Sequence, residues 1–418
     1  MTANALSSVV VAGAGMAGFQ IGASLRELGY AGRVVLVGDE PGLPYQRPPL
    51  SKAFLLGTAD AERLAMRPER YYAEKHIEVI AGKRVVALDR ARHCVTLDDD
   101  NTLEYGHLVF AVGARNRPLS VPGADLRGVH YLRTLADAQA LKTALSTVER
   151  AVVIGAGFIG LEFAAVAAKL GVAVTVIEVA DRPMARALSP PMSSLFTREH
   201  EKAGVQFMFT SQVLQMLGQA GTVTAVETAD HRQVPTDVVV IGIGVQPNTE
   251  VAAAAGLAVQ NGIVVDDGLA TSDADVSAVG DCAAHPNSFA GGSSVRLESV
   301  QNATDQARCV AARLTGNPHH YASVPWFWSD QGNMKLQIAG LTNGYDQVVV
   351  RGDATGNACS VFCFKQGRLV GVESVNRPAD YMLGKRLIGQ RIGLSPAQAA
   401  DERFDLKAHV AGESPTSV

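Results

Sequence analysis

The chain has 418 residues, of which 47% are hydrophobic and 19% charged, with a formal net charge of −4 and a pI near 6.2. This length is too great for one ordinary hydrophobic core and predicts two or three domains. The slight acidity disfavours a nucleic-acid binder, and no apolar run reaches the ~18 to 20 residues of a membrane-spanning helix.

The start of the chain and its cysteines predict a location and limit the chemistry. The first residues, MTANALSS, lack the basic and apolar regions of a signal peptide, and five scattered cysteines are typical of a reducing compartment. We therefore expect a cytoplasmic protein. No cysteine pair has redox-disulfide spacing and no four could hold an iron–sulfur cluster, so redox chemistry needs a bound organic cofactor. No metal site is expected, and three histidines are predicted to be surface or loop residues: His285, His319 and His320.

The N-terminal segment predicts a dinucleotide-binding unit. Ser8–Ala12 is an apolar run typical of a buried parallel strand, a helix is expected over Phe19–Leu28, and a second strand over Arg33–Val37. The turn after the first strand has the pattern G-x-G-x-x-G, formed by Gly13, Gly15 and Gly18. These glycines permit a tight turn, the approach of a pyrophosphate and close helix packing. Asp39 is the preferred ribose ligand after the second strand, and Glu40 is the alternative.

The next segment, LPYQRPPLSK, contains three prolines in six residues. Prolines restrict the backbone, so this loop is predicted to hold Arg47 and Lys52 in fixed positions. A rigid pair of cations favours contact with an anion or a flavin over the alternative, a solvated surface loop.

Residues 83–115 are predicted to form strands, the last of them ending at Gly113. A second apolar strand, Val238–Gly244, also ends on glycine, and we expect the chain to cross between two nucleotide-binding domains at these two places. The intervening segment contains a second fingerprint, so its domain is inserted within the first.

That second fingerprint has the complete βαβ setting. Strands are expected over Ala151–Ile154 and Val172–Ile177, with a helix over Leu161–Leu170 between them. The glycines of its turn are Gly155, Gly157 and Gly160. Glu178 closes the second strand about 20 residues after the first glycine, where an acid binds the ribose hydroxyls. Two fingerprints in one redox chain predict FAD and a nicotinamide nucleotide.

Glu178 also predicts which nicotinamide nucleotide binds. A carboxylate at this strand end accepts hydrogen bonds from the ribose hydroxyls but repels a 2′-phosphate. We therefore expect NADH rather than NADPH, although Arg182 and Arg186 could weaken the preference.

The first domain resumes near Glu250. A strand ends at Gly280-Asp281-Cys282, where Asp281 could bind a ribityl chain, and Arg296–Arg313 is predicted to be helical. From about Tyr321 the pattern changes to strands, expected over Leu336–Leu341, Gln347–Arg351, Ser360–Lys365 and Leu369–Val375, followed by a helix over residues 379–390. The predicted domains are a FAD-binding domain (1–114 and 248–320), an NAD-binding domain (115–247) and a C-terminal α+β domain (321–418).

With these motifs in this order, including IGAGFIGLE, AVGDC, RLESVQNA and PWFWSDQ, nearly the whole chain resembles the bacterial FAD-dependent NADH:ferredoxin reductases. The pattern is most similar to the putidaredoxin reductase and palustrisredoxin reductase branch of that family. The resemblance implies a glutathione reductase-like fold: two Rossmann-like dinucleotide-binding domains plus the C-terminal domain.

The resemblance also implies roles for individual residues. Lys52 and Glu162 resemble the family's charged pair beside the reactive edge of the flavin, and Trp328 resembles the aromatic residue that borders it. The implied FAD-binding residues are Gly13, Gly15, Gly18, Asp39, Arg47, Lys52, Arg133, Asp281, Val300 and Trp328. The implied residues for the nicotinamide nucleotide are Gly155, Gly157, Gly160, Glu178 and Gly244. Without the resemblance, Glu162 could equally favour its helix N-terminus, and Lys52 could be solvated.

The implied activity is hydride transfer from NADH to FAD, followed by transfer of single electrons to a 2Fe–2S ferredoxin. That ferredoxin would serve a haem-thiolate monooxygenase or a Rieske dioxygenase. Such partners are usually acidic, so exposed cations could guide docking; the candidates are Arg308, Lys335, Lys385 and Arg386. The alternatives are reduction of rubredoxin or of a small acceptor, as in monodehydroascorbate reductases, and a signalling flavoprotein like apoptosis-inducing factor.

Overall fold

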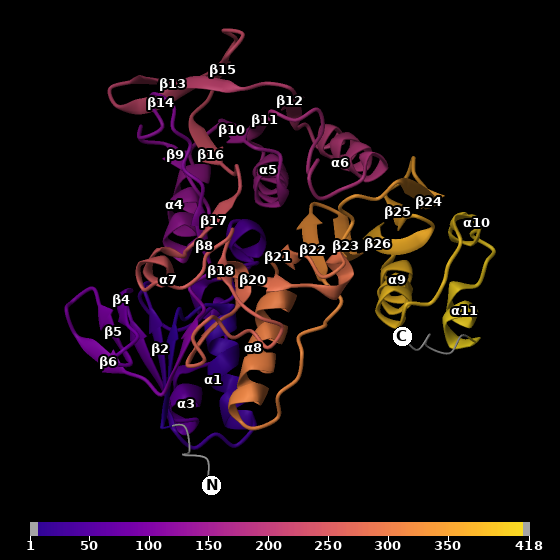
Figure 1. Cartoon of the computed structure of the whole chain (residues 1–418). Coiled ribbons are helices and arrows are strands. Elements are labelled where there is room, and N and C mark those ends of the chain that lie inside the picture. The colour runs from indigo at the N-terminus through magenta and orange to yellow at the C-terminus, as the bar shows by residue number, and fades with distance from the viewer. Residues whose placement is uncertain (1–6, 413–418) are drawn as a thin grey trace. The chain divides into compact units, whose positions relative to one another are not determined.

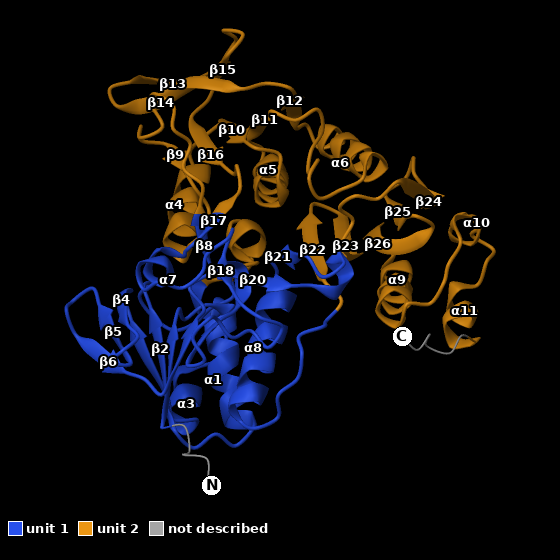
Figure 2. Cartoon of the chain, viewed as in Figure 1, with its two compact units in different colours: residues 1–46, 61–115, 246–323 blue, residues 47–60, 116–245, 324–418 orange. Residues whose placement is uncertain are grey.

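The computed structural model describes residues 7–412, and the chain divides into two compact units (Figure 2). Unit 1 comprises residues 1–46, 61–115 and 246–323; unit 2 comprises 47–60, 116–245 and 324–418. This division differs from the predicted domains in two respects. The loop 47–60 groups with unit 2, and the segment with the second fingerprint groups with the C-terminal segment.

Unit 1 is built on a parallel sheet with the strand order β19-β7-β1-β2-β3. Its central strand, β1 (Ser8–Ala12), has Val9, Val10 and Val11 fully buried, because helices and loops cover both faces of such a sheet. Helix α1 (Met16–Glu27) packs against α8 (Figure 1). Helix α8 spans Val300–Leu314. The other strands of the sheet are β2 (Arg33–Gly38), β3 (Ile77–Ala81), β7 (His107–Phe110) and β19 (Val276–Ala278).

Smaller elements complete this unit. One antiparallel sheet comprises β4 (Val85–Asp89), β5 (Cys94–Leu97) and β6 (Thr102–Glu104), and a second small sheet comprises β18 (Ile263–Val264), β20 (Ala283–Pro286) and β21 (Ser294–Val295). The short helices are α2 (Ala61–Leu64), α3 (Glu69–Glu74), α7 (Glu250–Ala254), η2 (Gly280–Cys282) and η3 (Ser288–Ala290). Two of the five places where the chain passes between the units lie within β8 (Ala114–Asn116) and β17 (Val245–Pro247).

The main parallel sheet of unit 2 contains the strands of the second fingerprint, and its strand order is β12-β11-β10-β16-β9. Helix α5 (Phe158–Lys169) follows β10 (Arg150–Ile154) and precedes β11 (Ala173–Ile177). The remaining elements are η1 (Leu50–Phe54), β9 (Val129–His130), α4 (Leu135–Leu145), α6 (Pro190–Lys202), β12 (Gln206–Met208), β13 (Val213–Gln219), β14 (Thr222–Thr228), β15 (Gln233–Pro235) and β16 (Val238–Ile241).

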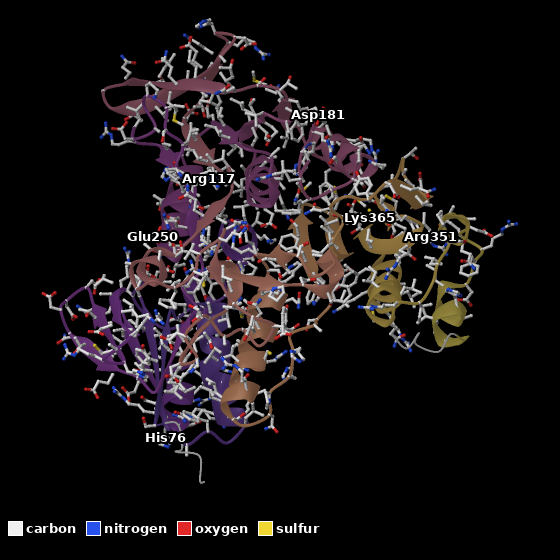
Figure 3. All side chains as sticks on the ribbon, viewed as in Figure 1. His76, Arg117, Asp181, Glu250, Arg351 and Lys365 are labelled. Atoms are coloured by element: carbon white, nitrogen blue, oxygen red, sulfur yellow. The ribbon has the colours of Figure 1, made fainter. Side chains whose placement is uncertain are left out.

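The C-terminal part of unit 2 is an antiparallel sheet of order β22-β23-β26-β25-β24 with three helices. Arg351, labelled in Figure 3, is only 5% exposed and donates to the carbonyl oxygens of Asp401 and Phe404, which fastens the last helices to β24. The elements are β22 (Trp326–Gln331), β23 (Met334–Gly340), β24 (Gln347–Asp353), β25 (Ala358–Lys365), β26 (Arg368–Val375), α9 (Pro378–Gln390), α10 (Pro396–Ala400) and α11 (Leu406–Gly412).

A buried carboxyl group joins this sheet to the start of α6. Glu373 on β26 is fully buried and accepts hydrogen bonds from the Ser189 backbone N–H (2.9 Å) and hydroxyl (2.6 Å). Burial raises the pKa of Glu373 to about 7, because an ionised carboxylate loses its hydration there. The first residue before α6 is therefore fixed to the C-terminal sheet.

Several local expectations were wrong. Lys52 lies on a helical turn, η1, rather than on a loop, and the strand β22 was not predicted. Helix α8 begins at Val300, four residues after the expected start, because Ser299 caps it by accepting from the Asn302 N–H. None of the described helices is long and apolar enough to span a membrane.

Candidate active site

Each unit contains one of the two glycine turns, and the two turns are packed in the same way. A Cβ atom added to the first glycine would lie 2.2 Å from the Ala111 oxygen in one copy (Gly13) and 2.6 Å from the Gly242 oxygen in the other (Gly155). The third glycines, Gly18 and Gly160, are equally closed, because an added Cβ would lie 1.9 Å and 2.4 Å from the oxygen of the first glycine of the same turn. Both turns are therefore packed too tightly for any other residue at these positions.

The second glycines are different, because they leave room for a ligand. An added Cβ at Gly15 meets no atom within 4 Å, and at Gly157 the nearest atom is 3.7 Å away. These residues precede α1 and α5, which begin without a side-chain cap and without an acid in the first turn. The free N–H groups of a helix start suit a pyrophosphate, so both turns fit the dinucleotides that the sequence predicts.

This difference between the glycines predicts the behaviour of two substitutions. Gly15→Ala should fold, because its φ of −80° is ordinary and the site is open, but its Kd for FAD should rise about tenfold or more as the methyl group blocks the pyrophosphate. Titration of the apoprotein with FAD measures this. Gly393→Ala is the matched control, since that glycine is also open and has no positive φ; an unchanged Kd for Gly15→Ala would refute the assignment.

Glu178 is held at the end of β11 by backbone donors. Its two carboxylate oxygens accept hydrogen bonds from the N–H groups of Ala156 (2.6 Å) and Ala180 (2.8 Å). Each oxygen has a second lone pair available for a ribose hydroxyl. The structure thus ties this acid directly to the glycine turn of the same unit.

The first fingerprint has no acid at the equivalent position, and the reason is steric. Gly38 ends β2, and an added Cβ there would lie 2.6 Å from the Cβ of Ala14 in the glycine turn. Asp39 is exposed and lies 3.5 Å from an Arg84 nitrogen, whereas the half-buried Glu40 accepts a hydrogen bond from the Tyr45 hydroxyl (2.6 Å). The choice of Asp39 over Glu40 as the ribose ligand stays a prediction.

Lys52 and Glu162 form an ion pair within unit 2. Helical turn η1 packs on α5, and the Lys52 ammonium lies 2.6 Å from Oε2 of Glu162. The Lys52 side chain is 20% exposed and also donates to the Pro48 carbonyl, whereas the Glu162 side chain is 3% exposed. The pair therefore has a buried carboxylate and a lysine side chain that is partly accessible and held in a fixed position.

The sequence did not reveal the other donors to Glu162. The Ser51 hydroxyl donates to Oε2 (2.5 Å) and the Ser329 hydroxyl donates to Oε1 (2.7 Å). Gln331 in turn donates to Ser329 (3.1 Å) and is bonded to His200 (2.8 Å). The only available signal was the alternation of Ser329 and Gln331 in WSDQ, which places both on one face of a strand.

Two other predicted residues lie close together in unit 2. Arg47 donates from Nη1 to the carbonyl oxygen of Arg133 (2.8 Å), which immediately precedes the capped start of α4 at Thr134.

Trp328 on β22 is half-buried, its ring centre is 5.6 Å from that of Trp326, and it points to the face opposite Ser329. Gly244 has a φ of +100°, and a Cβ atom added to it would lie 3.6 Å from an Arg186 side-chain nitrogen.

In unit 1, η2 places Asp281 beside the start of α1. An added Cβ at Gly280 would lie 3.4 Å from that of Ala17, and the Gly280 N–H donates to Gln306 on α8. Val300 is the first residue of that helix. An added Cβ at Gly280 would also lie 3.6 Å from that of Ala303, one turn after Val300, so Asp281 follows a residue packed between the first turns of α1 and α8.

His285 was expected to be a surface or loop residue, but it lies in strand β20 of unit 1 and is fully buried. It contacts Asn287 and Gln306, and burial lowers its pKa to about 4. All five cysteines are free and buried. In the described part of the chain, no cluster of three or more histidine, cysteine or acidic side chains is placed to hold a metal ion.

Comparisons with known proteins agree with this geometry. A family model described as pyridine nucleotide-disulphide oxidoreductase matches residues 7–307, and one described as reductase C-terminal matches residues 326–410. Rhodocoxin reductase from Rhodococcus erythropolis is 52% identical over 409 residues, which cover 98% of this chain and 96% of that protein.

Two solved structures are similar over nearly their whole length. The ferredoxin reductase for the CYP199A2 system from Rhodopseudomonas palustris has a TM-score of 0.95 and 50% identity, covering 97% of this chain and 100% of that chain. Putidaredoxin reductase, in its covalent complex with putidaredoxin, has a TM-score of 0.95 and 41% identity, covering 98% and 99%. The predicted fold class is confirmed. The chain belongs to the pyridine nucleotide-disulphide oxidoreductase family and, within it, to the FAD-dependent NADH:ferredoxin reductases.

Proposed function

We propose that this reductase uses the Lys52–Glu162 pair to promote hydride transfer from NADH to FAD, and that its 2Fe–2S ferredoxin serves a haem-thiolate monooxygenase. The observation that carries the role of this pair is its 2.6 Å contact, in which the Glu162 side chain is 3% exposed and the Lys52 side chain 20%. The similarity to the ferredoxin reductase for the CYP199A2 system and to putidaredoxin reductase supports the choice of acceptor. When bound, the two cofactors supply the redox chemistry: NADH gives a hydride, and the flavin releases its two electrons singly to two ferredoxins.

The residues of the chain have binding and electrostatic roles. The turns at Gly15 and Gly157 would hold the two pyrophosphates, Glu178 the adenosine ribose of NADH, and Asp281 the ribityl chain of FAD. Lys52 would stabilise negative charge on the reduced cofactor, with no reorganisation because Glu162 already fixes its position. No general base is required, since neither half-reaction removes a proton from carbon.

All five cysteines are free and buried within the described residues. The thiols of Cys282 and Cys363 have raised pKa values because of burial, so neither is an activated thiolate. This supports electron transfer from flavin to ferredoxin without a dithiol relay, and free thiols support a cytoplasmic location.

The surface of the reductase that docks the ferredoxin is proposed to include Arg308. The Arg308 side chain is 60% exposed and lies 3.5 Å from Asp305 on the same helix. Arg308→Glu should raise the KM for ferredoxin about three- to tenfold by slowing encounter with an acidic partner, while flavin reduction by NADH is unchanged. Steady-state and stopped-flow assays measure the two quantities. Arg70→Glu, on another exposed helix of the same unit, is the control; a slower flavin reduction in Arg308→Glu would contradict the docking role.

The test of the proposed function is NADH-driven cytochrome c reduction with no carrier, with a 2Fe–2S ferredoxin and with rubredoxin. We expect a large stimulation by ferredoxin and little by rubredoxin. Adding a haem-thiolate monooxygenase and its substrate should then couple NADH oxidation to product formation. Fast reduction without any carrier would instead support a small-molecule acceptor, and no stimulation by any carrier would support the signalling alternative.

A further inference from the structure

A continuous series of buried polar side chains leads from α6 to the Lys52–Glu162 pair. His200 on α6 lies 2.8 Å from Gln331, Gln331 lies 3.1 Å from Ser329, and Ser329 lies 2.7 Å from Glu162. All these residues belong to unit 2, but they come from α5, α6 and β22, which are far apart in the sequence. The series ends on the carboxylate oxygen that Lys52 does not contact.

Each hydrogen bond in this series donates toward Glu162. The Oε1 atom of Gln331 can only accept, so His200 donates from Nε2, and burial lowers the pKa of His200 and keeps the imidazole neutral. The Gln331 amide then donates to the Ser329 oxygen. The Ser329 hydroxyl proton therefore points to Oε1 of Glu162.

Stability alone does not explain why a core contains such a series. Ser329 and Gln331 are fully buried, and His200 is 2% exposed. Polar groups in a core lose their hydration, and apolar residues of similar shape commonly stabilise a core at least as well. A fully satisfied polar network instead fixes the positions of its members.

Helix α6 is itself held at both ends against the C-terminal sheet. Ser189, immediately before the helix, is bonded to Glu373 on β26, and His200, near its end, is bonded to Gln331 on β22. The donor at the start of the series is therefore attached to a fixed element rather than to a flexible one.

We propose that Ser329 is a positioning residue for hydride transfer: its hydroxyl, oriented by Gln331 and His200, holds one oxygen of Glu162 so that the other stays on Lys52. This inference rests on the proposed role of the Lys52–Glu162 pair. It predicts that Ser329 and Gln331, which do not contact Lys52, affect the rate of flavin reduction through Glu162 and Lys52.

The first test is kinetic. In Ser329→Ala the rate of flavin reduction by NADH should fall about tenfold, the effect of losing one hydrogen bond to a charged group, with the Kd for NADH unchanged. Ser329→Thr retains the hydroxyl and should recover most of the rate. Ser374→Ala, which removes a buried serine from the same sheet outside the series, should leave the rate unchanged.

A double-mutant cycle tests whether Gln331 acts through Ser329. Gln331→Met removes the amide with little change of shape and should slow reduction about three- to tenfold. The double variant should be no slower than Ser329→Ala alone, because Gln331 has nothing left to orient. Effects that multiply would show independent action and overturn the series.

The second readout does not depend on turnover. In holoenzyme containing ¹⁵N-labelled histidine, the neutral His200 ring should carry its proton on Nε2 at pH 8. Ser329→Ala should shift this resonance and speed its exchange with water, whereas Ser374→Ala should not. An unaltered reduction rate in Ser329→Ala would overturn the positioning role, and an unaltered His200 signal would overturn the series through Gln331.

The two proposals fail separately. If Lys52→Ala reduces its flavin normally, the role of the ion pair is lost even though the His200 resonance still responds to Ser329. If Ser329→Ala does not fold, Gln331→Met tests the series through the reduction rate without altering a donor to Glu162, and a wild-type rate in that variant would overturn the proposal.

Discussion

Flavin reduction by NADH is expected to slow about 100-fold when Lys52 is replaced by alanine, while FAD remains bound. The ammonium is the positive charge beside the buried Glu162, and the Lys52 side chain is open enough, at 20% exposure, to face a ligand. Its removal also leaves a buried carboxylate with only hydroxyl donors, Ser51 and Ser329. Anaerobic stopped-flow absorbance at the flavin band measures the rate directly.

A matched lysine near the same helical turn provides the control. Lys142 on α4 lies with its ammonium 4.8 Å from the ring centre of Phe54 in η1, but it has no part in the ion pair. Lys142→Ala should therefore retain the wild-type reduction rate. A normal rate of flavin reduction in Lys52→Ala would show that Lys52 has no role in hydride transfer.

The second large effect is expected for Glu178→Ala. Loss of two charge-assisted hydrogen bonds to the ribose should lower kcat/KM for NADH about 10- to 100-fold, whereas NADPH, whose 2′-phosphate the carboxylate repels, should lose much less. The ratio of the two kcat/KM values measures the preference. It should fall toward one.

The control for this prediction is Glu201→Ala, which removes an exposed acid from α6. The glycine turn must also be considered, because Glu178 accepts from the Ala156 N–H. Glu178→Gln keeps the size of the side chain and its acceptor oxygen and should preserve most NADH activity while improving NADPH. An unchanged ratio in both variants would exclude a ribose role.

The strands and glycine turns could be predicted because their signals are local. The apolar run Ser8–Ala12 has the predicted bounds in the structure, and each fingerprint occupies one turn between a strand and a helix. The helices begin earlier than expected, at Met16 and Phe158, since the first turn follows the second glycine directly. Propensity alone cannot locate such a start.

Apart from Lys52, the surroundings of Glu162 could not be predicted, because they come from three segments far from α5 in the sequence: η1, β22 and, through Gln331, α6. Ser51, His200 and Ser329 are ordinary residues in the sequence, and only the folding of η1, α5, α6 and β22 together makes them donors. The same reason explains His285, whose burial depends on packing against Tyr321 and Gln306.

The ribose ligand of the first fingerprint illustrates a different limit. The spacing of the acids after β2 favours Asp39 and keeps Glu40 as the alternative, and the structure shows why neither stands at the strand end: Gly38 is packed against Ala14. Local spacing predicted the type of ligand but not the residue.

The most direct test of the central claim is the stoichiometry of anaerobic electron transfer. Purified reductase containing FAD is mixed with an excess of oxidised 2Fe–2S ferredoxin and titrated with NADH, and the reduced ferredoxin is counted by absorbance. A hydride carries two electrons and each cluster accepts one, so two ferredoxins should be reduced per NADH. NADH oxidation without ferredoxin reduction would contradict the account.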